Sequence, residues 1–199
     1  MDKGLQRFLG NVKKEFDKNV ESIGVESLKK AAEIILESEK KGGRIHVTGI
    51  GKPGHVAGYI ASLLSSTGTS AYELNGTEAV HGSSGQVKPG DVVIAISNSG
   101  ETEELKATVQ TLLANGARII SCTGNAQSWL AKHSEVCLLA HVDMEGDDLN
   151  KPPRASILSE TLVLQCLSVI LQNQKKLNLN QYVRWHPGGS LGKSIKSML

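Results

Sequence analysis

Residues 97–104 read SNSGETEE and gather polar groups directly after the apolar run DVVIAI. Two serines, an asparagine and a glycine ahead of a predicted helix offer hydroxyls, backbone N–H groups and the positive end of the helix dipole. Thr102 adds a further hydroxyl at or near the N-cap. A helix needs only one capping residue, so this accumulation favours a binding site for a phosphate dianion over a simple helix cap.

A second turn, GIGKPG at residues 49–54, has the spacing G-x-G-x-x-G between a predicted strand and a helix. Glu73 closes the next strand, where dinucleotide-binding folds place an acid for the ribose hydroxyls. However, Lys52 and Pro53 interrupt the turn with a long cation and a residue that lacks an N–H. A dinucleotide would not require the loop at residues 97–102, and neither loop matches G-x-x-x-x-G-K-[ST]. The sequence therefore favours a small phosphorylated ligand over a nucleotide.

Five short apolar runs must position these loops, each closed by Gly, Ser or Asn and followed by a helical stretch. They are IHVTGI, SAYEL, DVVIAIS, ARIISCTG and EVCLLAHV. Strands that alternate with helices pair in parallel, because each parallel neighbour needs a crossover. Runs without polar alternation are typical of strands covered on both faces. We predict an α/β protein, a three-layer α/β/α sandwich with a five-stranded parallel sheet and its ligand at the carboxyl ends of the strands.

Residues 1–43 predict two amphipathic helices, because apolar residues recur at helical spacing between Lys and Glu. We expect the charged side chains to form a solvated face, and the helices to pack on the domain or on a partner subunit. Residues 44–199 are assigned to one ligand-binding domain, since 199 residues are too few for two full-sized domains.

Composition argues against several classes of partner. The 22 Lys and Arg against 20 Asp and Glu leave no basic surplus for nucleic acid, and 4% aromatic residues offer no platform for base stacking. No run approaches the roughly 18 consecutive apolar residues of a membrane span, and the N-terminus lacks the apolar block of a secretory signal. We expect a cytoplasmic protein with neither a membrane nor a nucleic-acid partner. Cys122, Cys137 and Cys166 are expected to be small buried hydrophobes.

Four motifs in the same order, GIGKPGH, ELNGTEAVHG, ISNSGETEE and HPGGSLGK, closely resemble the sugar isomerase (SIS) family, and within it the arabinose-5-phosphate isomerases. The resemblance covers nearly the whole chain from about Leu28 onward. It implies a flavodoxin-like α/β/α domain that acts on a phosphorylated sugar without a nucleotide or other cofactor. It also implies a homo-oligomer, usually a tetramer, with sites at subunit boundaries.

The resemblance implies a role for each matching residue. The implied phosphate ligands are Ser97, Asn98, Ser99 and Thr102, helped by Ser65 or Ser66. The implied polar groups around the sugar are Lys52, His81, Glu101, Glu145 and His186. Gly49 and Gly51 would let the backbone approach the sugar closely.

Interconversion of an aldose and a ketose requires ring opening, proton transfer between adjacent carbons through an enediol, and stabilisation of the developing oxyanion. A carboxylate suits the proton transfer if partial burial raises its pKa toward neutrality, and both Glu101 and Glu145 are candidates. Lys52 and His81 suit stabilisation of the enediolate, and His186 suits proton exchange at the ring oxygen. This route requires no metal, although zinc bound by the pocket histidines would inhibit it.

The sequence departs from the family pattern at three places. Ser83 stands where Asp is usual, and residues 151–156 read KPPRAS in place of a stretch close to L-A-P-T-S-S. Fuller members continue into paired CBS domains, and we expect this chain to lack that regulatory module. The first two changes leave the exact sugar open.

The leading hypothesis is an isomerase of D-ribulose 5-phosphate and D-arabinose 5-phosphate. The alternatives are a 6-phospho-3-hexuloisomerase, a non-catalytic phosphosugar sensor that regulates a partner protein, and an NAD-dependent oxidoreductase.

Overall fold

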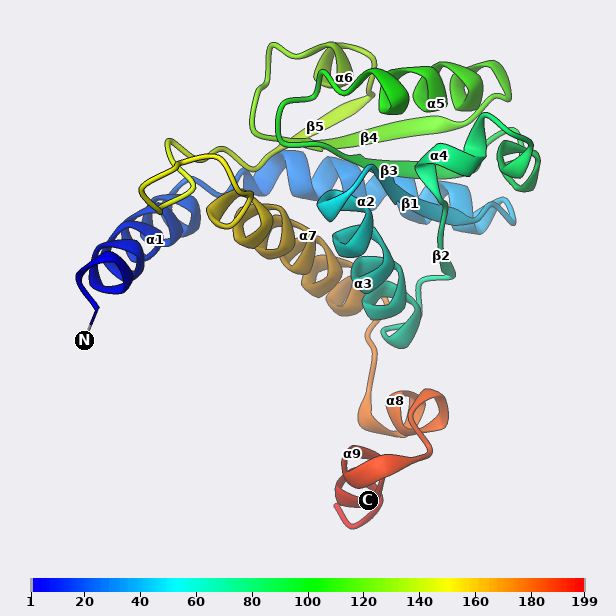
Figure 1. The fold of residues 1–199 in the computed structure, drawn as a ribbon. Coiled ribbons are helices and arrows are strands. Elements are labelled where there is room, and N and C mark those ends of the chain that lie inside the picture. Colours follow the sequence, from blue (N-terminus) through cyan, green and yellow to red (C-terminus); the bar gives the residue numbers. More distant parts are fainter. Residues whose placement is uncertain (1, 199) are drawn as a thin grey trace.

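Five strands form one sheet in the computed structural model, which describes residues 2–198 (Figure 1). They are β1 (Ile45–Gly49), β2 (Ala71–Glu73), β3 (Val92–Ile96), β4 (Arg118–Thr123) and β5 (Val136–Leu139). The order is β2-β1-β3-β4-β5 and all neighbours are parallel, which confirms the predicted fold class. The strand order reverses between β1 and β3, the point at which open parallel sheets bind their ligands.

Helices cover both faces of this sheet. On one face lie α2 (Val25–Lys40), α3 (Lys52–Ser66) and α7 (Ala155–Gln174), with α1 (Lys3–Glu21) packed on α7. On the other face lie α4 (Gly76–Ala79), the 3-10 turn η1 (Ser83–Gln86), α5 (Glu103–Ala114) and α6 (Trp129–Lys132). The three layers seen in Figure 1 hold the loops after β1 and β3 at one edge.

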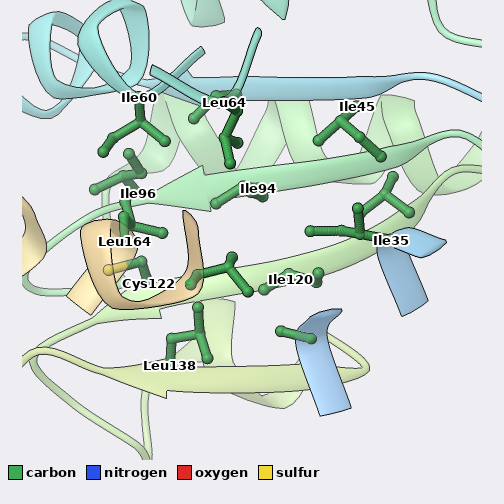
Figure 2. Close-up of a cluster of buried hydrophobic side chains, with 14 of the residues drawn as sticks. Ile35, Ile45, Ile60, Leu64, Ile94, Ile96, Ile120, Cys122, Leu138 and Leu164 are labelled. Carbon is green, nitrogen blue, oxygen red and sulfur yellow. The ribbon is translucent and has the colours of Figure 1, made fainter. Parts of the chain in front are cut away.

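The three central strands, β1, β3 and β4, are buried on both faces, which explains why they read as continuous apolar runs. Ile94, Ile96 and Cys122 pack with Leu164 of α7 on one face (Figure 2), whereas Val93 belongs to the cluster on the other. Cys122 is buried as expected. The prediction is wrong for Cys137 and Cys166, which are only partly buried, because they lie toward the margins of the core.

The N-terminal helices differ in how they contribute to the fold. Helix α2 supplies fully buried residues such as Ala31 and Ile35 to the core, so the core extends across residue 43. Helix α1 leaves an apolar stripe exposed, formed by Leu5, Leu9, Phe16 and Val20. The division into residues 1–43 and 44–199 stays a prediction.

Helix α7 is long and apolar enough to cross a membrane by length and composition alone. Half of its most apolar window is buried within the fold, where it packs on α2 and α3. This burial is typical of the core helix of a folded domain.

The last two helices, α8 (Leu179–Trp185) and α9 (Gly189–Lys196), form a tail that projects from the body (Figure 1). The ring of Trp185 packs directly on Gly68, where an added Cβ would lie 2.7 Å from the indole. Gly68 lies just beyond the end of α3, so the tail joins the body at the amino edge of the sheet.

Candidate active site

The loop after β3 brings four polar residues to the carboxyl edge of the sheet. They are Ser97, Asn98, Ser99 and Thr102. Ser97 is 4% exposed, and its hydroxyl accepts the N–H of Gly100 at 3.1 Å and lies 3.2 Å from the Thr102 hydroxyl. The exposed Ser99 hydroxyl accepts the N–H of Glu101 at 3.2 Å. Ser97 therefore shapes the turn from inside, while Ser99 lies on its outer surface.

Helix α5 begins directly after this loop without a side-chain cap. Thr102 occupies the N-cap position, but its hydroxyl forms no capping hydrogen bond to the first turn. The first N–H groups of a helix have no partner within it, and the helix dipole favours an anion beside them. The structure thus places hydroxyls and a helix N-terminus together, in the arrangement that binds phosphate groups.

The turn after β1 lies at the same edge of the sheet, next to the loop after β3, because β1 and β3 are neighbouring parallel strands. An added Cβ at Gly49 would lie 2.8 Å from the carbonyl carbon of Pro53, so only glycine allows this close approach. Gly51 has a φ of 65°, in the region that favours glycine. The turn borders an open hollow of about 260 Å³ that extends to Asn75 at the end of β2. Because α3 has proline in its first turn, it also has one donor fewer for a dinucleotide pyrophosphate.

Lys52 is the first residue of α3 and is exposed. Together with His55 it lines a second open hollow, of about 370 Å³, between the start of α3 and the start of α7. Pro153 and Ile157 form the α7 side of this hollow. Lys52 therefore faces the beginning of α7.

Glu101 is engaged with neighbouring groups. Its carboxylate pairs with Lys106 at 2.8 Å and accepts the N–H of Trp129 at 2.7 Å. The pKa of Glu101 is lowered mainly by the hydrogen bond from Lys106 and to a smaller extent by that from Trp129. The expectation that burial raises this pKa is wrong, because the side chain is 49% exposed and bound to a cation. Glu104, in the first turn of α5, has no ion pair within residues 2–198.

Glu145 lies in the loop between β5 and α7 and is half-buried. One of its carboxylate oxygens accepts the N–H of Arg154 at 2.6 Å and the N–H of Ser156 at 3.1 Å. Arg154 is the N-cap of α7 and provides no side-chain cap, so Glu145 serves that purpose. The structure thereby fixes this carboxylate at a helix N-terminus beside the hollow that Lys52 borders.

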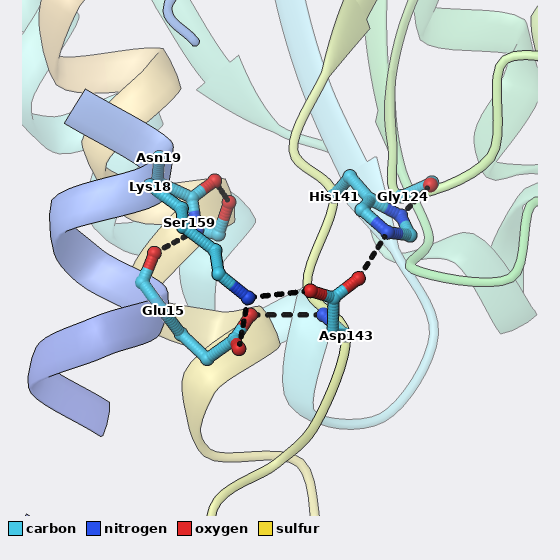
Figure 3. Close-up of polar contacts among 7 residues, drawn as sticks. All are labelled: Glu15, Lys18, Asn19, Gly124, His141, Asp143 and Ser159. Atoms are coloured by element: carbon cyan, nitrogen blue, oxygen red, sulfur yellow. Dashed lines mark hydrogen bonds and ion pairs between the residues drawn. The ribbon is translucent and has the colours of Figure 1, made fainter. Parts of the chain in front are cut away.

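Helix α1 holds the same loop in place (Figure 3). The Lys18 ammonium lies 2.6 Å from the Asp143 carboxylate, and the buried Glu15 carboxylate accepts the N–H of Asp143 at 2.9 Å. Asp143 also lies 3.1 Å from Nε2 of His141. The hydrogen bond from Lys18 lowers the pKa of Asp143, and the carbonyl of Gly124 raises the pKa of His141. The prediction that the charges of α1 form a solvated face is therefore wrong for Glu15, which is buried, whereas Lys18 is exposed as expected although it pairs with Asp143. No pattern in the sequence indicates these contacts between α1 and the loop.

Ser65 and Ser66 lie far from the loop after β3. They end α3, which runs from the carboxyl edge back to the amino edge, about 20 Å along its axis. The Ser65 hydroxyl donates to the carbonyl of Ala71, where β2 begins, at 2.7 Å. The prediction that these serines help Ser97 to bind one phosphate is wrong within a single chain, because the helix separates the two ends.

The two predicted site histidines lie in different places. His81 is exposed in the turn after α4, a helix that packs on α5, so it lies on the same face of the sheet as α5. His186 ends α8 in the projecting tail, and its ring stacks on Tyr182 with centroids 4.2 Å apart. The structure does not bring His186 to the carboxyl edge within one chain. Within residues 2–198, no group of three or more His, Cys, Asp or Glu is arranged to hold a metal ion.

Known proteins share this arrangement. Residues 38–169 match the SIS domain. An arabinose 5-phosphate isomerase KdsD of Francisella tularensis is 36% identical over 170 residues, 85% of this chain and 52% of that protein. An arabinose 5-phosphate isomerase KpsF of Escherichia coli O6:H1 is 38% identical over 153 residues, 77% of this chain and 47% of that protein. The chain thus spans about half the length of the curated relatives it matches.

A solved structure from Escherichia coli CFT073, in complex with arabinose 5-phosphate, superposes with a TM-score of 0.85 at 32% identity. The match covers 92% of this chain and 95% of that one. The residues that match the SIS domain, 38–169, include the whole sheet, the loops at its carboxyl edge and most of α7. The chain belongs to the SIS domain family.

Proposed function

We propose that this protein is an aldose–ketose isomerase that interconverts D-ribulose 5-phosphate and D-arabinose 5-phosphate through an enediol. The hydroxyl-rich loop at the uncapped start of α5 carries the proposal, since it lies beside the Lys52 turn where the strand order reverses. Relatives named arabinose 5-phosphate isomerases support the same activity.

In this proposal the phosphoryl group binds Ser99, Thr102 and the N–H groups of α5, and the sugar carbons extend toward Lys52. Lys52 and His81 stabilise the negative charge of the enediolate. Glu145 transfers the proton between the carbons, because its carboxylate is fixed at α7 beside the same hollow. Glu101 is the weaker candidate for this base, since its carboxylate is bound to Lys106. The route uses neither a metal nor a cofactor.

Isomerisation in deuterated water tests this proposal. A panel of pentose and hexose phosphates is incubated with the protein, and deuterium at C1 or C2 is measured by NMR. Glu145→Gln should reduce exchange by about 100-fold or more, whereas Glu33→Gln, on the exposed side of α2, should not. Deuterium exchange by Glu101→Gln and Glu104→Gln, measured in the same way, shows whether a carboxylate near the loop after β3 is also needed for the proton transfer. Tight binding of a phosphosugar with neither product nor deuterium exchange, for every sugar of the panel, would contradict an isomerase and indicate a sensor.

We also propose that the active unit is a homo-oligomer, a tetramer, in which a second copy supplies His186 to the site. The projecting tail supports this, because it holds His186 away from the site of its own chain (Figure 1). Exposed apolar side chains on α1 and on the tail also support it, since such surface is typical of an interface. They include Leu9, Phe16, Trp185 and Leu191. We further propose that the protein works in the cytoplasm, on the evidence of its composition.

A further inference from the structure

Glu160 is an ionisable residue in the interior of the fold. It lies in the second turn of α7 and is 0% exposed. Neither carboxylate oxygen has a hydrogen-bond partner among the described residues. An unpaired ionised carboxylate is strongly disfavoured in an apolar interior, whereas the neutral acid is tolerated much better. The surroundings therefore favour the protonated form.

Glu160 lies directly behind Glu145. Ser156 precedes Glu160 by four positions, so the two side chains share one face of α7. The N–H of Ser156 holds the Glu145 carboxylate at 3.1 Å, and the buried Ser156 hydroxyl lacks a partner in the described chain, as Glu160 does. Glu145, Ser156 and Glu160 thus form a polar column that leads from the edge of the candidate site into the core.

The elements packed around α7 bring few charges to Glu160. The loop after β5 contributes Glu145, and β4 contributes the buried thiol of Cys122. Helix α2 buries no ionisable side chain. On α1, Glu15 and Lys18 are bound to Asp143, and on α3, Lys52 and His55 border the hollow beyond Ile157. The pKa of Glu160 is raised to about 8, mainly by burial and to a smaller extent by the charge of Glu145.

We propose that Glu160 is a positioning residue of the isomerase, a neutral acid that keeps a second negative charge away from Glu145 at the start of α7. This inference rests on the proposed function for its catalytic consequence. Ionisation of Glu160 places a second negative charge behind the site. Because the enediolate also develops negative charge, that ionisation slows the reaction.

The pH dependence of kcat/KM tests this role. Turnover of arabinose 5-phosphate is measured from about pH 6 to about pH 10 for the wild type, Glu160→Gln and the control Glu33→Gln. The wild type and the control should lose about tenfold per pH unit once Glu160 ionises. Glu160→Gln should match the wild type near neutral pH and remain level through that range. The same alkaline fall in Glu160→Gln, or a large loss of its activity near neutral pH, would overturn the proposal.

An infrared measurement tests the protonation state without turnover. At neutral pH the wild type should show the carbonyl band of a buried protonated carboxylic acid, which disappears at high pH and is absent from Glu160→Gln. Glu160→Met serves as a second uncharged variant if the amide variant does not fold. A wild type that turns over sugar but lacks the band overturns the role of Glu160 alone. A wild type that turns over no phosphosugar removes the proposed function, and the catalytic part of this inference with it.

Discussion

Glu145 and Glu160 show how one short segment gives two carboxyl groups different environments. Glu145 accepts two N–H groups at the start of α7, whereas Glu160 has no partner within the described residues and no exposure. Pairs of titratable groups held in such different environments are a common way to divide acid and base forms at one pH.

Glu160→Gln should stabilise the protein more at pH 8 than at pH 5. The pKa of Glu160 in the folded protein, about 8, lies above its usual 4.5, so its contribution to stability is fully present below about pH 4.5. That contribution is lost as the pH rises to about 8, by about 1.4 kcal/mol per pH unit relative to the variant. Urea unfolding across this range measures the difference, with Glu33→Gln as the control. A difference between wild type and Glu160→Gln that does not change with pH would contradict a raised pKa.

Ser99→Ala should raise KM for the phosphosugar and leave stability almost unchanged. Ser99 is exposed, and among residues 2–198 its hydroxyl bonds only the N–H of Glu101. A hydrogen bond to a charged phosphate is worth about 1.5–3 kcal/mol, or roughly 10- to 100-fold in binding. Steady-state kinetics and thermal unfolding measure both effects, and Ser62→Ala, exposed on α3, is the matched control. An unchanged KM would remove Ser99 from the phosphate site.

At the scale of elements, α1 acts as a clamp on the loop that carries Glu145. The contact combines a buried carboxylate, an ammonium group and a buried amide, since Asn19 accepts the Ser159 hydroxyl of α7. Exposed ion pairs alone contribute little to stability, so the buried Glu15 matters most here.

Glu15→Gln should loosen the segment at residues 140–146 without unfolding α7. The variant loses the carboxylate that accepts the N–H of Asp143 and also binds Lys18. Hydrogen exchange of the amides in this segment should become faster, while exchange in the middle of α7 should not change. Glu21→Gln, exposed on the same helix, is the control. Equal protection in the wild type and Glu15→Gln would show that other contacts hold the loop.

At the scale of the whole molecule, the candidate site is incomplete in one chain. Lys52 lines the hollow between the starts of α3 and α7, and Glu145 is bound at the start of α7, whereas His186 lies on the tail that leaves the amino edge. A second copy that contributes its tail would complete the set.

Two inactive variants should therefore restore each other's activity. Lys52→Ala and His186→Ala should each reduce turnover strongly, but co-refolded mixtures should regain activity, because some sites then contain both native residues. Sedimentation analysis of the same mixtures checks that the subunits assemble. Assembly of mixed oligomers without any recovery would contradict a site shared between copies.

The sheet and the loop after β3 could be predicted because each depends on contiguous residues. Every strand is a short apolar run, and Ser97, Ser99 and Thr102 follow one another within a single turn. Position along a helix is harder to foresee: Ser65 is joined to Lys52 by α3, which carries it to the opposite edge of the sheet.

The burial of polar side chains by tertiary packing could not be predicted from the sequence. Glu15 and Glu160 lie in helices whose neighbouring residues include other polar side chains, so neither position differs in pattern from a solvated one. Only the packing of α7 between α1 and the sheet shows that both are buried. Likewise, the motif HPGGSLGK identifies His186 as a candidate site residue but does not indicate which copy of the chain it would serve.

The reach of the tail away from its own body has a kinetic consequence. An enzyme that needs a neighbour's histidine has no complete active centre when it is a monomer. Its rate per milligram should then decline on dilution below the dissociation constant of the assembly and return on concentration. The concentration of the protein would thereby set the activity of each molecule as well as the total activity, because assembly follows mass action.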